Sequence, residues 1–167
     1  HGTYFVTGNH EYFWEPLKWI EEMERLGMRV LLNAHHVIEH RGQKIVVAGV
    51  TDVSGDHFLA QHRSDPKKAV ADAPEDAKLR LLLAHQPRSA YDAESLGFHL
   101  QLSGHTHGGQ FFPATWLIGL VLSFVQGLHR HKDCWVYTNR GTGYWGPPVR
   151  TTEAPNEITE IVLVRES

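Results

Sequence analysis

The sequence predicts an α/β fold in a single domain that spans residues 1–167. Short apolar runs rich in β-prone residues alternate with stretches that repeat apolar residues every three or four positions, which is typical of strands and helices packed in layers. With 167 residues, 41% of them hydrophobic and 21% charged, the chain can bury the core of one soluble domain. It contains no internal repeat, low-complexity tract or linker that would divide it.

The first half of the chain is expected to hold strands, one long helix and a hairpin. Residues 3–7 predict a short buried strand. Residues 15–26 predict a helix, since Pro16 suits a first turn and Gly27 a helix end. The further elements expected here are a strand at 28–32, a hairpin of 36–39 and 44–50, a polar loop at 51–62 and a helix at 65–73.

The second half is expected to continue the sheet. Residues 79–84 form a fully apolar run and predict a buried strand, followed by a helix at 89–96 that Gly97 ends. Three more strands are expected at 98–102, 134–138 and 158–164.

The most apolar stretch, WLIGLVLSFVQGL at Trp116 to Leu128, allows two interpretations. It is too short to cross a bilayer, which takes about 20 residues. One interpretation is a buried helix. The other is a membrane-facing or lipid-contacting lid, with Arg130, His131 and Lys132 as a basic flank suited to anionic lipid.

Composition excludes some classes of function. A formal net charge of −3 argues against nucleic acid as the main partner, although it allows a phosphorylated substrate at one metal-loaded site. The single cysteine, Cys134, excludes an intrachain disulfide. The 13 histidines supply the commonest metal ligand in proteins, but surface histidines such as His129 and His131 can be merely solvated.

Polar residues follow three of the predicted strands. Gly8-Asn9-His10-Glu11 follows the first, His85-Gln86-Pro87 the second, and Gly104-His105-Thr106-His107-Gly108-Gly109 the third. Ligand sites form at the carboxyl ends of strands in α/β sheets, so we expect Asn9, His85, His105 and His107 to converge. His105 and His107 are two positions apart and can face the same metal or two neighbouring metals. Any one of these histidines alone is equally explained as a hydrogen-bonded residue at a strand end.

These motifs together resemble the calcineurin-like metallophosphoesterase superfamily. GNHE at 8–11, His85 and GHTH at 104–107 match its later motifs in order. The runs GHTHGGQFFP, RGTGYWGPPVR and NEITEIVLV resemble its branch of small, often membrane-anchored or exported bacterial enzymes. The resemblance covers nearly the whole chain and implies a four-layer αββα sandwich. For localisation it implies membrane association or export, with a cytoplasmic place left open.

The resemblance also implies roles for residues. Asn9, His85 and His105 would bind one divalent metal, His107 would bind a second, and His10 would act on the phosphoryl group and its leaving oxygen. The metals would be manganese, iron, zinc or nickel, and the substrate a phosphorylated small molecule or a phospholipid-type compound. Arg140 and Arg150 could hold a substrate phosphate, or simply form a structural turn. Asp52 and Asp56 are expected to be cap or loop carboxylates, with a supporting role near the site as the alternative.

One departure from the family pattern limits this assignment. The family begins with Asp-x-His and Gly-Asp motifs on two earlier strands, and no such pair precedes Thr3. The resemblance therefore implies a C-terminal portion without the N-terminal strands, with at most one well-coordinated metal and poor activity on its own. Such a chain is expected to associate with itself or with the missing N-terminal half. Two alternatives stay open: an inert binding or scaffold module that kept part of a metal site, and a mononuclear zinc hydrolase.

Overall fold

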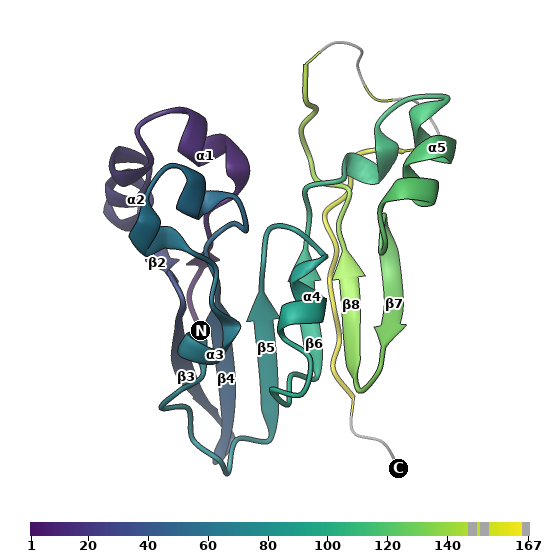
Figure 1. Ribbon diagram of the computed structural model, residues 1–167. Helices are drawn as coiled ribbons and strands as arrows, with labels where there is room; N and C mark the ends of the chain where they lie inside the picture. Colours follow the sequence, from purple (N-terminus) through teal and green to yellow (C-terminus); the bar gives the residue numbers. More distant parts are fainter. Residues whose placement is uncertain (147–149, 151–153, 165–167) are drawn as a thin grey trace.

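The computed structural model describes residues 1–146, 150 and 154–164. Its strands are β1 (Tyr4–Phe5), β2 (Arg29–Val30), β3 (Ala34–His40), β4 (Gln43–Gly49), β5 (Leu79–Leu83), β6 (Leu100–Ser103), β7 (Gly127–His131) and β8 (Cys134–Thr138). Its helices are α1 (Asn9–Phe13), α2 (Pro16–Arg25), α3 (Pro66–Ala69), α4 (Ser89–Asp92) and α5 (Ala114–Val121), with 3₁₀ turns η1 (Gly55–His57), η2 (Ala60–His62) and η3 (His107–Gly109). The predicted α/β class is confirmed (Figure 1).

The strands form a six-stranded mixed sheet and a separate pair. The large sheet has the order β3-β4-β5-β6-β8-β7, and β1 pairs with β2. Strands β4, β5, β6 and β8 are parallel, while the two edge strands are antiparallel to their neighbours. Because β5 and β6 are parallel neighbours, the residues that follow them emerge at the same edge of the sheet (Figure 1).

The two faces of β4 pack against different layers. On one face Val46 and Val50 are buried in a core that includes Ala69 of α3 and Ala93 just after α4. On the other face Gly49 faces the small sheet: an added Cβ would lie 2.5 Å from Leu31 Cβ and 2.7 Å from Val6 Cγ1. Helices therefore cover one face and the β1–β2 pair covers the other. Helix α2 in turn contacts β2, so the elements follow the αββα order, with two strands of the second sheet in the described residues.

The strand predicted at 158–164 is not formed. Residues 155–164 contain no strand or helix, and Ile158 and Val164 are 91% and 82% exposed. The start of this segment is held by one backbone hydrogen bond, from the Glu157 amide to the Gly141 carbonyl (3.0 Å), and by side-chain hydrogen bonds from Tyr137 Oη to Glu157 (2.6 Å) and from Asn139 Nδ2 to Thr159 (3.1 Å). A β-prone run needs a partner strand, and in the described part of the chain this one has none.

The interpretation of Trp116 to Leu128 as a buried helix is wrong. The helical part is α5, which ends at Val121, and no residue of α5 is buried. Trp116, Leu120 and Val121 are between 80% and 83% exposed. The run then changes direction and enters β7, a strand that the sequence did not predict. Among the described residues, no helix has both the length and the apolar character needed to cross a membrane.

The helices predicted at 65–73 and 89–96 are shorter than expected, since α3 ends at Ala69 and α4 at Asp92. Asp65 does cap α3 as predicted, because its carboxylate accepts a hydrogen bond from the Lys68 amide at 2.9 Å.

Candidate functional site

Asn9 and His10 lie in the first turn of α1 rather than at the tip of a strand, because β1 ends at Phe5. The turn is fixed by Glu11, whose carboxylate accepts a hydrogen bond from the Gly8 amide at 2.6 Å. This contact satisfies an amide at the start of the helix and explains the acidic residue of the motif.

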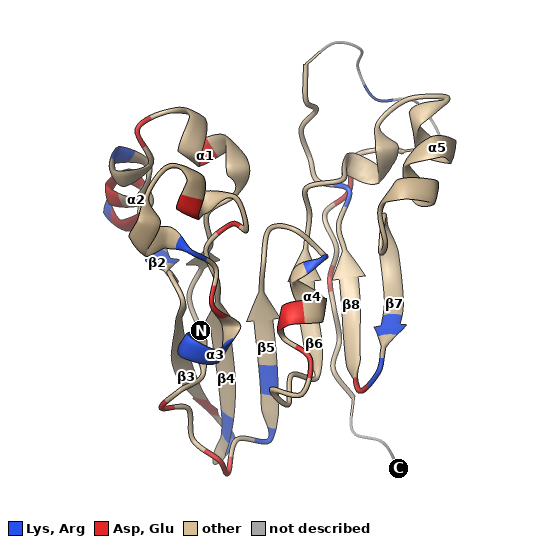
Figure 2. Ribbon diagram, viewed as in Figure 1, with Lys and Arg blue, Asp and Glu red and all other residues tan. Residues whose placement is uncertain are grey.

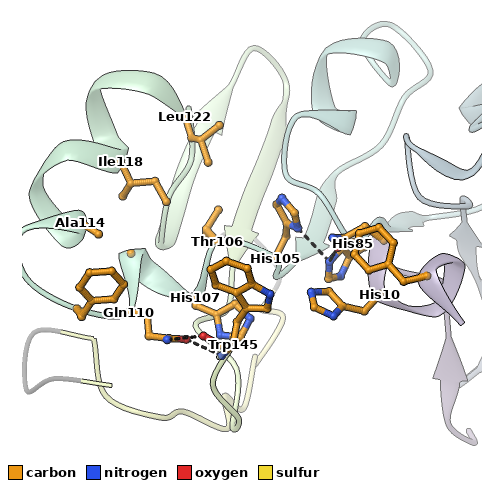
Figure 3. A pocket seen from close by; sticks show the side chains of 14 residues that line it. His10, His85, His105, Thr106, His107, Gln110, Ala114, Ile118, Leu122 and Trp145 are labelled. Atoms are coloured by element: carbon orange, nitrogen blue, oxygen red, sulfur yellow. Dashed lines mark hydrogen bonds between the residues drawn. The ribbon is translucent and has the colours of Figure 1, made fainter. Parts of the chain in front are cut away.

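Three donor atoms from distant parts of the chain meet at the floor of one pocket. Asn9 Oδ1 lies 3.1 Å from His85 Nε2, and His85 Nε2 lies 3.2 Å from His105 Nδ1. The two imidazole rings meet edge to face with centroids 5.0 Å apart (Figure 3). The expected convergence of Asn9, His85 and His105 is thus found: they come from the start of α1, the end of β5 and the end of β6.

The spacing of these donors is compatible with one shared metal ion. Two ligands bound to zinc at about 2.0–2.1 Å, with angles near 90–110°, place their donor atoms roughly 2.9–3.4 Å apart. The measured separations, 3.1 and 3.2 Å, fall in this range. Two imidazole nitrogens and one carboxamide oxygen form a donor set that manganese, iron or zinc accept.

The set is nevertheless partial. In the part of the chain that the structure describes, no three or more His, Cys, Asp or Glu side chains are grouped so as to hold a metal ion. The third donor here is the neutral amide of Asn9, and a divalent ion would need further ligands.

Burial keeps both imidazoles of the set in their neutral form. Desolvation, and secondarily the neighbouring His105, lowers the pKa of His85 to about 4. Desolvation also lowers the pKa of His105. Neutral imidazoles keep the lone pair that a metal needs, so neither proton nor charge blocks this donor set near pH 7.

Gly8 is a further residue that shapes the site. A Cβ at this position would lie 2.9 Å from three ring atoms of His85. The backbone of Gly8 has φ −102° and ψ 177°, which other residues adopt freely. Glycine is needed here because the chain passes directly against the imidazole of His85.

His107 lines the same pocket but is engaged elsewhere. Its Nδ1 accepts a hydrogen bond from Arg150 Nη2 at 3.0 Å. In the neutral ring that leaves the proton on Nε2, so both nitrogens are occupied and His107 offers no free lone pair in this arrangement. Burial and the charge of Arg150 lower its pKa. The structure thus places His107 beside the Asn9–His85–His105 set but not in it.

The loop that carries His105 and His107 has an unusual backbone. His105, His107 and Gln110 have φ values of 70°, 52° and 57°, and Gly108 and Gly109 also have positive φ. Non-glycine residues with positive φ are uncommon, and such conformations cluster at functional sites. At Gly109 an added Cβ would also lie 2.5 Å from Thr115 Cα. The two glycines therefore let this loop turn and pack against α5.

His10 projects into the pocket from α1 (Figure 3). Its side chain is exposed, and its ring meets Phe13 edge to face at 5.5 Å. It lies near the Asn9–His85–His105 set without being part of it.

Arg140 and Arg150 do not line the pocket. Arg140 forms an ion pair with Glu157. Arg150 donates hydrogen bonds to the carbonyls of His107 (3.0 Å), Gly143 (2.5 Å) and Ala154 (3.1 Å). In this structure both arginines therefore fasten the loop around RGTGYWGPPVR, of which residues 147–149 lie outside the described residues.

Asp52 is a buried carboxylate directly behind the site. Gln86, the residue after His85, donates from its side-chain amide to both oxygens of Asp52 at 3.1 and 3.2 Å. Asp52 also accepts hydrogen bonds from the amide and hydroxyl of Ser54, at 2.9 and 2.6 Å, and its own amide donates to Thr7 Oγ1 at 3.3 Å. The loop role expected of Asp52 is found, and its contacts connect the ends of β1, β4 and β5. Asp56, in η1, has a side chain that is 37% exposed.

The pocket has a volume of about 490 Å³. Its lining residues are Asn9, His10, Phe13, His85, His105, Thr106, His107, Gly109, Gln110, Phe111, Ala114, Ile118, Leu122 and Trp145.

Comparisons with known proteins show which proteins this chain resembles. No protein-family model matches the chain. The chain is 38% identical over 97% of its length to a zebrafish (Danio rerio) protein described as a transmembrane protein with metallophosphoesterase domain, of which it covers 38%. It is 37% identical over 98% of its length to an uncharacterized metallophosphoesterase of Helicobacter pylori, of which it covers 43%. The chain thus spans about two fifths of the length of these relatives.

The fold has a counterpart among solved structures. The sulfate thiohydrolase SoxB of Thermus thermophilus superposes with a TM-score of 0.57 at 18% identity, over 81% of this chain and 27% of SoxB. This likeness concerns the fold alone. The sequence relatives and the order of the GNHE, His85 and GHTH motifs agree with it: over nearly its whole length the chain is similar to proteins described as metallophosphoesterases.

Proposed function

We propose that this chain supplies part of the active site of a metal-dependent phosphoester hydrolase, acting on a phosphomonoester, phosphodiester or pyrophosphate bond. The observation that carries the proposal is that Asn9 Oδ1 and His105 Nδ1 lie 3.1 and 3.2 Å from His85 Nε2, and that all three residues line one pocket. The similarity to proteins described as metallophosphoesterases supports the reaction class, and the length of the relatives supports further ligands from outside these 167 residues.

In the proposed site each residue has one task. Asn9, His85 and His105 hold one divalent ion, and His107 can join a second ion after its Nδ1 is released by Arg150. When bound, the ions supply Lewis acidity and an activated water. His10, exposed at the pocket rim, donates a proton or hydrogen bond to the leaving oxygen. Arg140 and Arg150 support the loop beside the site.

A second candidate is an inert binding or scaffold module. It is favoured by one observation: the described residues provide no complete group of three His, Cys, Asp or Glu ligands. The third candidate, a mononuclear zinc hydrolase, would need one zinc ion, whereas the proposed enzyme needs two ions and the inert module catalyses no reaction.

Assays of turnover and metal binding, carried out on the full-length protein and on this 167-residue chain, distinguish the two-metal hydrolase from the two alternatives. We expect the full protein to hydrolyse p-nitrophenyl phosphate with manganese, iron, zinc or nickel, and His105→Ala to reduce turnover by roughly 100-fold or more. The 167-residue chain alone should turn over poorly. Metal binding without turnover by the full protein would favour the inert module, and full activity with one zinc per chain the mononuclear enzyme.

A further inference from the structure

The pocket has two unlike sides. Asn9 and the histidines form one side, while Ala114 and Ile118 of α5 and Leu122 just after it form the other, with the indole of Trp145 between them beside His107 (Figure 3). A volume of about 490 Å³ is in the range of pockets that enclose whole organic ligands, so it has room for more than a phosphoryl group.

The apolar side is built into the same segment as the histidines. Helix α5 begins five residues after Gly109, and the close approach of Gly109 to Thr115 fixes the helix against the loop. The Thr115 amide also donates to the Phe111 carbonyl at 3.0 Å. The side chain of Gln110 also makes two hydrogen bonds with the backbone of Trp145, at 2.8 and 2.7 Å. These contacts therefore hold the apolar residues of α5 at a fixed position relative to the loop that carries the histidines.

No lysine, arginine, aspartate or glutamate lines this pocket in the described part of the chain. Figure 2 likewise shows α5 without charged residues. A ligand with several phosphates would bring charges that only cationic side chains or metals could balance, and the apolar side offers neither. An alkyl or aryl group, in contrast, gains free energy by leaving water for this surface.

On the basis of the proposed function, we infer that the substrate is an amphiphilic phosphoester. Its phosphoryl group lies at the Asn9–His85–His105 set, and an alkyl or aryl group bonded through the ester oxygen lies along Ile118 and Leu122. The outward face of α5, with Trp116, Leu120 and Val121, is not needed for this contact. Of the residues expected to flank the apolar run, Arg130 is the second-last residue of β7 and Lys132 lies in the turn after it, so several residues of β7 separate both from α5.

A series of alkylphosphonates tests this inference. Methyl-, butyl- and octylphosphonate, each below its micellar concentration, are titrated by calorimetry into the full-length protein with manganese. Burial of each methylene should tighten binding about threefold to fourfold, at least from methyl to butyl. Ile118→Asn should flatten this dependence. Leu120→Asn, on the exposed face of the same helix, should leave it intact and serves as the matched control.

Equal affinities for the three phosphonates in the wild-type protein would overturn the inference, whatever the variants do. So would a chain-length dependence that survives Ile118→Asn but is lost in Leu120→Asn, because it would place the alkyl group on the outer face of α5. Hydrolysis of methyl phosphate, measured in parallel, reports on the proposed function separately. Turnover of methyl phosphate combined with no chain-length dependence contradicts the amphiphilic substrate alone.

Discussion

The side-chain oxygen of Asn9 lies 3.1 Å from Nε2 of His85, although 76 residues separate them. Asn9 belongs to α1, beside the β1–β2 pair, and His85 follows β5 of the large sheet. The site therefore spans the two sheets, and any change in their packing should alter the distances between the donor atoms.

Gly8→Ala should weaken metal binding while the fold is retained. The new Cβ would lie 2.9 Å from the ring of His85 and must displace it, whereas the backbone conformation of Gly8 suits alanine. We expect a loss in zinc affinity of about tenfold or more, by analogy with changes that misorient ligands. Calorimetry measures it. Gly119→Ala, in open space on α5, is the control and should bind zinc like the wild type.

Asp52→Ala should destabilise the protein by about 1–3 kcal/mol, because it leaves partly buried donors of Gln86 and Ser54 without their buried acceptor. Urea unfolding followed by circular dichroism measures this difference. Asp56→Ala, at the more exposed position, should change stability by no more than about 0.5 kcal/mol. Equal effects of the two substitutions would mean that the contacts of Asp52 do not connect the strand ends.

Stability should fall as the pH drops below about 6.5, the ordinary pKa of histidine. Burial lowers the pKa of His62, whose Nδ1 is 2.8 Å from the Tyr12 hydroxyl. The unfolded chain then binds a proton that the folded chain excludes, so stability is lost from about pH 6.5 down to the folded pKa. In denaturant titrations, His62→Gln should reduce this loss. The matched control is His57→Gln, whose side chain is 77% exposed. An unchanged pH dependence in His62→Gln would contradict the assignment.

The 167-residue chain should associate in solution. Ile158, Val162 and Val164 are 72–91% exposed, as are most of the large side chains of α5, and exposed apolar surface of this kind promotes association. Analytical ultracentrifugation should find dimers or larger species. A monomer at all concentrations that binds no hydrophobic dye would show that the core needs no partner.

Much of the fold was predictable because the relevant signals are local. The hairpin of β3 and β4, the apolar strand β5 and the capped start of α3 each follow from periodicity or turn residues within a few positions. The meeting of His85 and His105 was predictable because β5 and β6 are parallel neighbours that end at one edge. The place of Asn9 beside them, on an element next to the other sheet, was predictable only from the order of the family motifs.

The features that the sequence did not predict depend on contacts between residues far apart in the chain. Residues 158–164 have the composition of a strand, but a strand forms only where another strand receives its hydrogen bonds. The apolar character of α5 does not reveal which side is covered, and most of its side chains proved exposed. The engagement of His107 by Arg150 and the close approach of Gly8 to His85 are distances between remote residues, which no local pattern encodes.

The central claim, that this chain contributes Asn9, His85 and His105 to one metal ion, is tested most directly by imidazole ¹⁵N NMR of the chain during zinc titration. His1 and His40 also bring ring nitrogens within 3.1 Å of each other, so the titration is done in a His40→Gln background. We predict that His85 Nε2 and His105 Nδ1 shift together at the first equivalent of zinc, while the nitrogens of His62 do not. Zinc-induced shifts confined to other histidines, or shifts of His85 and His105 at different zinc concentrations, would contradict the account.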